Sequence, residues 1–173
     1  MIVVLVGYMA SGKSTIGKIL ARKLDYKFVD LDEYIEKKEG QFVKNIFASK
    51  GEIYFRKKES LYLKEIVVSR SNLVLSLGGG TPCYSGNMDL LLENHNVVSI
   101  YLKSSIDTLV GRLKLEENER PLIAHLKSEE QLTEFIGKHL FERMQFYAQS
   151  NFTVTTDIKS ETEIIEDIIV KLF

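Results

Sequence analysis

The chain of 173 residues lacks the features that mark several classes of protein. Its single cysteine, Cys83, excludes an internal disulfide and is compatible with a reducing cytoplasm. Its two prolines leave no proline-rich linker, and no apolar run approaches the length of a membrane span. A net charge of −1 does not favour a polyanionic partner such as nucleic acid. We therefore expect one cytoplasmic, monomeric domain over residues 1–173, whose important basic residues surround a small anionic ligand.

The chain is also poor in metal-ligating and nucleophilic side chains. Its three histidines, His95, His125 and His139, are scattered without the spacing of metal ligands, so we interpret them as structural or exposed. Cys83 has no activating partner nearby in the sequence, which favours a half-buried thiol over a nucleophile. The motifs that indicate chemistry lie elsewhere in the chain.

A phosphate-binding loop is predicted near the start of the chain. Residues 7–14 read Gly-Tyr-Met-Ala-Ser-Gly-Lys-Ser and fit the pattern G-x-x-x-x-G-K-[ST]. They follow an apolar strand at 2–6 and precede helical spacing of apolar residues at 15–24, so helix N-terminal N–H groups would face the phosphates. Lys13 can reach the β- and γ-phosphates, and the Ser14 hydroxyl can bind Mg²⁺. The alternative is a glycine turn that carries a lysine by chance.

The hydrophobic pattern predicts strands that alternate with helices. Strands are expected at 2–6, 26–32, 72–77, 96–102 and 152–155, and helices at 15–24, 31–38, 42–50, 51–70, 86–94, 105–115, 128–148 and 160–172. This alternation is typical of the α/β class, a three-layer sandwich with a five-stranded parallel sheet and helices on both faces. Ligands of such sheets bind at the carboxyl ends of the strands, where the phosphate loop and the next two strand ends would converge.

Two carboxylates end the second predicted strand. Asp30 and Asp32 are two residues apart, so on an extended segment their side chains share a face. One carboxylate near Mg²⁺ and one near an acceptor hydroxyl would suit phosphoryl transfer. The alternative is that Asp32 caps a helix beginning at Glu33, because aspartate is a favoured N-cap residue.

A glycine triplet and three arginines are further candidates. Residues 78–80 are all glycine and let the backbone approach a ligand closely, although a flexible turn would look the same. Arg56 has Glu59 three residues later, as in a surface ion pair. Arg120 lies in a polar segment and suits a lid that closes over phosphates, but a solvated charge is equally possible there and at Arg143.

Five further motifs resemble those of the shikimate kinase family, in the same order and with compatible spacings. They cover residues 28–32, 46–59, 75–81, 120–122 and 143–147, so that with the phosphate loop the resemblance spans nearly the whole chain. It implies a nucleoside-monophosphate-kinase-like fold, with a substrate-binding helical segment at about 31–60 and a mobile lid at about 113–126. It also implies that ATP and Mg²⁺ serve the phosphorylation of the shikimate 3-hydroxyl, on the route to chorismate and aromatic amino acids.

The resemblance also implies roles for individual residues. The implied catalytic residues are Lys13, Asp32 and Arg120, with Asp32 as the base. The implied shikimate-binding residues are Asp32, Arg56, Gly78, Gly79, Gly80 and Arg143, in which Arg56 and Arg143 grip the carboxylate. The implied ATP-binding residues are Gly7, Ala10, Ser11, Gly12, Lys13, Ser14, Thr15, Arg112 and Arg120. Ser14, and Asp30 through a water molecule, are implied on the Mg²⁺ side.

The resemblance also leads to expectations for Ala10 and for the charge of Asp32. Many family members have glycine where this chain has Ala10, which should perturb the loop geometry only mildly. The two arginines of the carboxylate clamp should favour the ionised form of Asp32.

Two other functions remain open from the sequence. A kinase of the same fold could act on another polyol acid such as gluconate, or on a nucleotide, although the clamp residues argue against both. A nucleotide-binding switch that phosphorylates no metabolite is the alternative from a different class. A GTPase would be expected to show a guanine-recognition segment of the N-K-x-D type, and the sequence has none.

Overall fold

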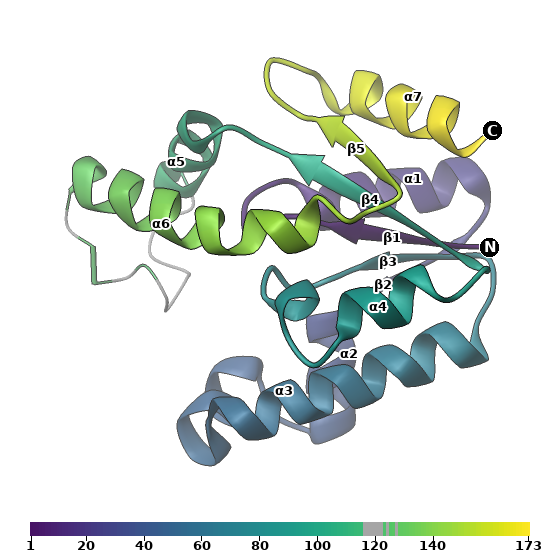
Figure 1. Ribbon diagram of the computed structural model, residues 1–173, viewed down its shortest axis with the longest axis horizontal. Helices are drawn as coiled ribbons and strands as arrows, with labels where there is room; N and C mark the ends of the chain where they lie inside the picture. Colours follow the sequence, from purple (N-terminus) through teal and green to yellow (C-terminus); the bar gives the residue numbers. More distant parts are fainter. Residues whose placement is uncertain (116–122, 124, 127) are drawn as a thin grey trace.

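The computed structural model describes residues 1–115, 123, 125–126 and 128–173. Their strands form one parallel sheet in the order β2-β3-β1-β4-β5, with helices on both faces (Figure 1). The strands are β1 (Ile2–Val6), β2 (Lys27–Asp30), β3 (Leu73–Ser76), β4 (Val97–Lys103) and β5 (Phe152–Thr155). The predicted parallel α/β sandwich is confirmed.

Helices lie in the connections between the strands, because parallel strands need long crossover connections. They are α1 (Lys13–Leu24), α2 (Leu31–Glu39), α3 (Val43–Ser69), α4 (Asn87–Leu92), α5 (Ile106–Leu115), α6 (Glu129–Tyr147) and α7 (Glu161–Leu172), with a short 3₁₀ turn, η1, at Thr81–Cys83. The predicted ends of the strands and helices agree with these bounds to within two residues. Among the described residues, none of the helices is long and apolar enough to cross a membrane.

The central strand β1 is buried on both sides, as its unbroken apolar sequence predicted. Ile2, Val4 and Val6 point into one core, which is closed by α2, α3, α4, α5 and α6. Val3 and Leu5 point into the other core, which α1 and α7 close. Figure 1 shows α1 and α7 side by side, away from the long helix α3. This double burial fixes β1, and therefore the loop that follows it.

Helix α3 is two helices joined by a kink at Gly51, where φ is 80° and ψ is 171°. The predicted break between residues 50 and 51 is therefore correct. Glycine adopts this conformation without the steric cost that a Cβ would add. Across the kink, the rings of Phe47 and Phe55 pack with centroids 4.5 Å apart. The kink redirects the second half of α3, which carries Arg56 and Glu59 to the site described below.

Glu39, at the end of α2, ties that helix to α3. Its carboxylate accepts hydrogen bonds of 2.6 Å from both Tyr54 Oη and Tyr62 Oη, and it lies 3.0 Å from Lys58 Nζ. The side chain is 6% exposed. The two tyrosine hydroxyls, with Lys58, lower the pKa of Glu39 to about 2 despite its burial. This buried but well-paired carboxylate holds the α2–α3 pair together.

Candidate functional site

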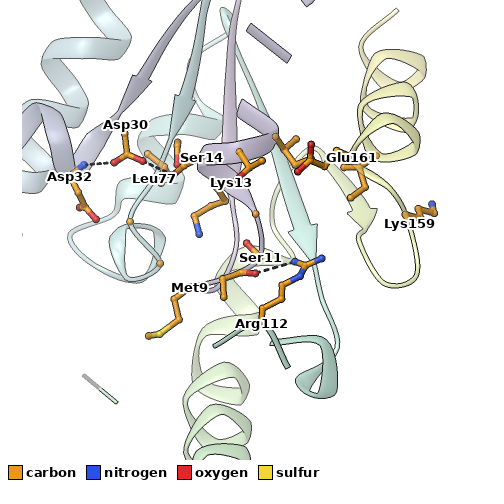
Figure 2. A pocket seen from close by; sticks show the side chains of 18 of the residues that line it. Met9, Ser11, Lys13, Ser14, Asp30, Asp32, Leu77, Arg112, Lys159 and Glu161 are labelled. Carbon is orange, nitrogen blue, oxygen red and sulfur yellow. Dashed lines mark hydrogen bonds between the residues drawn. The ribbon is translucent and has the colours of Figure 1, made fainter. Parts of the chain in front are cut away.

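A cavity of about 480 Å³ opens at the carboxyl ends of β1, β2 and β3 (Figure 2). It is lined by Met9, Ala10, Ser11, Gly12, Lys13, Ser14, Thr15, Ile16, Asp30, Asp32, Ser76, Leu77, Gly78, Gly79, Arg112, Leu115, Lys159, Glu161 and Ile164. The three predicted strand ends therefore converge as parallel topology requires. In Figure 2, Asp30 and Asp32 lie on one side of the phosphate loop, and Lys159 and Glu161 lie on the opposite side.

The phosphate loop runs from Gly7 into the first turn of α1. Lys13 is almost buried, and its Nζ donates to the backbone carbonyls of Gly7, at 2.9 Å, and Tyr8, at 2.8 Å. These contacts hold the ammonium group over the loop, where it faces the cavity (Figure 2). Since α1 begins at Lys13, the N-terminal N–H groups and the positive dipole end of this helix lie at the same place. Such an arrangement of N–H groups and positive charge can bind an anion such as phosphate.

Ala10 stands in the left-handed region, with φ of 60°. A glycine would adopt this conformation more cheaply, since the left-handed region costs a residue with a Cβ roughly 1–2 kcal/mol. The Ala10 carbonyl accepts a 3.0 Å hydrogen bond from Arg112 Nη1. Arg112, on α5, is thereby placed against the phosphate loop and at the wall of the cavity (Figure 2).

Asp30, rather than Asp32, is the N-cap of α2. Its Oδ1 accepts a 3.0 Å hydrogen bond from the backbone N–H of Asp32, and its Oδ2 accepts one of 2.9 Å from Ser14 Oγ. The predicted cap at Asp32 is wrong because β2 ends at Asp30, the last extended residue, and the helix already begins at Leu31. The two aspartates therefore do not share the face of one strand. A strand-to-helix junction brings them together.

Asp32 opens on the cavity, but the chain around it removes most of the water from its carboxylate. This burial, together with the nearby charges of Asp30 and Glu59, raises the pKa of Asp32 to about 7. Lys13 and Arg56 oppose the shift only in part. Arg56 therefore favours the ionised form of Asp32, as expected, but its effect is smaller than the opposing ones. Desolvation and like charges outweigh the cations.

The glycine turn, residues 78–80, is the meeting point of the other predicted groups. A Cβ added to its first residue would lie 3.1 Å from Asp32 Oδ1. On the second it would lie 3.5 Å from Arg143 Nη1, and on the third 2.7 Å from Arg56 Nη2. The last distance is shorter than real Cβ contacts, so a side chain at Gly80 would displace the Arg56 guanidinium group. Side chains from α2, α6 and α3 thus converge on one turn.

Arg56 forms a partly buried ion pair and not the surface pair that its sequence suggested. Its Nη1 lies 2.8 Å from Glu59 Oε2, and Glu59 is 1% exposed. The other oxygen of Glu59 accepts a 2.6 Å hydrogen bond from Thr81 Oγ1, and Arg56 Nε lies 3.3 Å from Glu52 Oε1. Sequence reasoning missed the role of Glu59, because the i, i+3 spacing gives no sign of burial. Glu59 fixes Arg56 to the glycine turn.

Helix α6 closes the site on the side of Arg143. Tyr147, one turn later, is fully buried and donates a 2.5 Å hydrogen bond to the Gly79 carbonyl. The Arg143 guanidinium lies 5.9 Å from the centre of the Tyr8 ring, and Tyr8 Oη lies 2.9 Å from His139 Nδ1. Burial raises the pKa of Tyr8 to about 12. The interpretation of His139 as structural is confirmed, since it joins α6 to the phosphate loop.

The remaining predicted positions are Arg120, the lid and Cys83. Arg120 and most of the predicted lid, 113–126, lie outside the described residues. Cys83 is half-buried, as predicted, and burial raises its pKa, which disfavours the thiolate. Sequence reasoning missed Lys159 and Glu161, which line the cavity after β5. The only sign in the sequence that these two residues could reach the site is their position after the carboxyl end of a strand.

The chemistry of Ser14 and Asp30 fits the Mg²⁺ that the resemblance implies. A hydroxyl and a carboxylate lie within hydrogen-bond distance of each other at the phosphate loop. Mg²⁺ prefers such oxygens and usually takes only one or two from protein, with phosphates and waters completing its shell. Among the described residues, no group of three or more histidine, cysteine, aspartate or glutamate side chains could hold a metal ion.

Comparisons with known proteins identify relatives of the whole chain. A family model described as shikimate kinase matches residues 9–173. The shikimate kinase of Flavobacterium psychrophilum is 48% identical, over 96% of this chain and 95% of the relative. A crystal structure of shikimate kinase from Bacteroides thetaiotaomicron has a TM-score of 0.90 and 33% identity, covering 99% of this chain and 98% of that one. Shikimate kinase from Acinetobacter baumannii, in complex with shikimate, has a TM-score of 0.84 and 30% identity, covering 99% and 92%.

Proposed function

This chain belongs to the shikimate kinase family, and we propose that it transfers the γ-phosphoryl group of ATP to the 3-hydroxyl of shikimate. The products are shikimate 3-phosphate and ADP, on the route to chorismate and aromatic amino acids. The observation that carries the proposal is the convergence of Asp32, Arg56 and Arg143 on the glycine turn, beside a phosphate loop. This set of groups suits an acceptor with one carboxylate and several hydroxyls.

The two arginines form the proposed carboxylate clamp. Both guanidinium groups lie against adjacent residues of the glycine turn, and each comes from a different helix. A guanidinium group is planar and always charged, so it binds a carboxylate through paired N–H donors. The Glu59 carboxylate and the Tyr147 hydroxyl support this region from behind. Such a clamp orients the acceptor ring and leaves its hydroxyls facing the cavity.

Asp32 is the proposed base. Its carboxylate borders the first residue of the glycine turn and lies in the cavity shared with Lys13. A general base works best when its pKa is near the working pH, and burial holds the pKa of Asp32 at about 7. The ionised form can orient the acceptor hydroxyl and take its proton as the phosphoryl group is transferred.

The phosphate loop is the proposed ATP site. Its backbone N–H groups and the N-terminus of α1 would bind the β- and γ-phosphates, and Lys13 would exchange its two carbonyl contacts for phosphate oxygens. Arg112 stands at the wall next to the loop and would contact the nucleotide. By resemblance, Arg120 would contact the transferred phosphate. Ser14 and Asp30 would hold Mg²⁺, which, when bound, neutralises charge on the β- and γ-phosphates.

The enzyme is further proposed to act as a cytoplasmic monomer. The described groups of the proposed acceptor and ATP sites lie together within one chain, which supports a monomer. The single half-buried cysteine suits a reducing compartment. Light scattering on the purified chain tests the oligomeric state, and a dimer mass at micromolar concentration would contradict this part of the proposal.

The decisive experiment is an ADP-release assay with MgATP and a panel of acceptors. Shikimate, quinate, gluconate and nucleoside monophosphates are compared at equal concentrations. Turnover with shikimate is expected to exceed that with each of the others. Turnover with gluconate or a nucleotide instead would keep the fold and overturn the acceptor assignment. Tight ATP binding without turnover of any acceptor would favour the nucleotide-binding switch.

An arginine variant tests the clamp itself. Arg56→Ala removes one guanidinium group, and we expect the KM for shikimate to rise by a factor of about 10 to 100, as for loss of a charge-assisted hydrogen bond. The KM for ATP should change by less than about twofold. Arg22→Ala, on the exposed side of α1, is the matched control and should behave as the wild type. An equal rise in both KM values would show that Arg56 does not bind the acceptor.

A further inference from the structure

Tyr84 is a large aromatic side chain beside the proposed carboxylate clamp. It follows η1 directly after the glycine turn and is 38% exposed. Its ring centre lies 4.1 Å from Arg56 Cζ, closer than the rings of Phe55, at 5.3 Å, and Phe47, at 5.9 Å. Within about 6 Å a ring face attracts a guanidinium group electrostatically. Tyr84 is therefore the ring that lies nearest to the cation of the proposed clamp.

Arg56 makes two kinds of contact, through its N–H donors and through its charge. Glu59 and Glu52 take hydrogen bonds from the N–H donors at the edge, through Nη1 and Nε. A ring near the cation attracts it without using a donor. The ring contact can therefore hold the guanidinium group in place while the remaining N–H donors, including those on Nη2, stay able to bind a carboxylate.

The position of Tyr84 is fixed by the same buried carboxylate that holds Arg56. Thr81, three residues before Tyr84, donates to Glu59, and the Thr81 carbonyl accepts from Asn87 Nδ2. The chain turns sharply after Tyr84, with Ser85 and Gly86 both at positive φ, of 55° and 66°. The Tyr84 carbonyl closes this turn by accepting from the N–H of Asn87, at 3.0 Å. The backbone that carries the ring is thus tied at both ends.

From this geometry we infer that Tyr84 is a positioning residue for the acceptor carboxylate, which acts by holding the guanidinium group of Arg56 in its binding orientation. The inference rests on the proposed function, because it needs an acceptor with a carboxylate at Arg56. It adds a specificity element from the segment after the glycine turn. Tyr84 touches Arg56 and is not assigned a contact with the substrate.

The test is a comparison of Tyr84→Leu with Tyr84→Phe. Leucine removes the ring face, so the KM for shikimate should rise about threefold to tenfold, the range expected for loss of a partly exposed cation–π contact. The kcat, the KM for ATP and the melting temperature should stay close to those of the wild type. Phenylalanine keeps the ring face and should restore the KM for shikimate to within about twofold. Equal KM values for Tyr84→Leu and the wild type would overturn the inference.

Two further measurements separate positioning from a structural role. In an Arg56→Lys background, Tyr84→Leu should raise the KM little further, because the planar guanidinium group is already gone. With shikimate methyl ester, which lacks the carboxylate charge, Tyr84→Leu should leave the KM nearly unchanged. An equal rise in KM for the ester, or a fall in kcat and melting temperature together, would assign Tyr84 a structural role instead.

Turnover of shikimate by the wild type shows whether a failure concerns the proposed function or only the role of Tyr84. If the wild type turns over no shikimate, the proposed function fails and the inference fails with it. If the wild type turns over shikimate and Tyr84→Leu has an unchanged KM, only the inference fails. The expected result is efficient turnover by both proteins, with a higher shikimate KM for Tyr84→Leu alone.

Discussion

Helix α2 carries two carboxylates whose pKa values are shifted in opposite directions. Asp32, in its first turn, has its pKa raised to about 7, whereas Glu39, at its last residue, has its pKa lowered to about 2. The helix dipole alone would produce the reverse order, because it stabilises negative charge at the N-terminus. That effect is worth only about 0.3–1 kcal/mol, and a shift of one pKa unit is already about 1.4 kcal/mol. The neighbours of each carboxylate decide its charge.

The two neighbourhoods differ in the donors that they offer. Two tyrosine hydroxyls and Lys58 surround Glu39, so its charged form is well solvated by the protein. Burial raises the pKa of Asp32, and the nearby charges of Asp30 and Glu59 raise it further. A carboxylate with matched donors stabilises the fold, while a buried one beside like charges destabilises it. Such a group is typical of functional sites, where protein stability is traded for reactivity.

The largest effect is expected for Asp32→Asn, which removes the carboxylate with the raised pKa. Removing the proposed base should lower kcat by a factor of about 100 to 10,000, the range for general base catalysis. Binding of ATP should be nearly unchanged. Steady-state kinetics with shikimate measure the loss, and Asp25→Asn, an exposed aspartate at the other end of α1, serves as the control. An unchanged kcat would remove Asp32 from the mechanism.

The same variant should make the protein more stable at high pH. Because the folded pKa of about 7 exceeds the unfolded value of about 3.9, the folded state holds the extra proton between them, and wild-type stability falls as pH rises through that window. Since the side chain opens on the cavity, water screens part of the cost, and we expect a gain of about 1–3 kcal/mol at pH 8. The gain should vanish near pH 4. Urea unfolding at both pH values tests the sign.

The pH dependence of catalysis sharpens the assignment of the raised pKa. Asp32 must be ionised to accept a proton, so kcat/KM for shikimate should fall about tenfold per pH unit below pH 7. Asp32→Asn should show a low rate without this acidic limb. A wild-type profile that stays flat down to pH 5 would contradict a base with a pKa near 7.

Glu39→Gln addresses the other end of α2 and should have the smallest effect. Weakening its hydrogen bonds should cost about 1–3 kcal/mol of stability at pH 7, with kcat and both KM values unchanged. The contribution of Glu39 is present above its unfolded pKa and is lost as pH falls towards about 2, so wild type and variant should converge in strong acid. Glu166→Gln, an exposed glutamate on α7, is the control. A large loss of activity in Glu39→Gln would contradict a purely stabilising role for Glu39.

Most of the architecture could be predicted from local sequence. The apolar run at 2–6, the spacing of Ile16 and Leu20 in α1, and the break at Gly51 each depend on periodicities that a short segment carries by itself. The phosphate loop is equally local, because the glycines, Lys13 and Ser14 are consecutive in sequence. Parallel topology then brings the ends of β1, β2 and β3 together without further information.

The tertiary structure alone decided how the charged groups behave. The sequence offered Asp32 as a possible cap and Arg56 as a possible surface ion pair, and both were wrong in the folded chain. Burial and electrostatic fields are sums over segments far apart in sequence, such as the approach of Glu59 to Asp32 or of Tyr84 to Arg56. No local pattern contains these sums. The sequence by itself therefore determined the phosphate loop and the strand ends that meet at the site. The packing of the helices around them determined which further side chains join the site, and the protonation, orientation and partners of its charged groups.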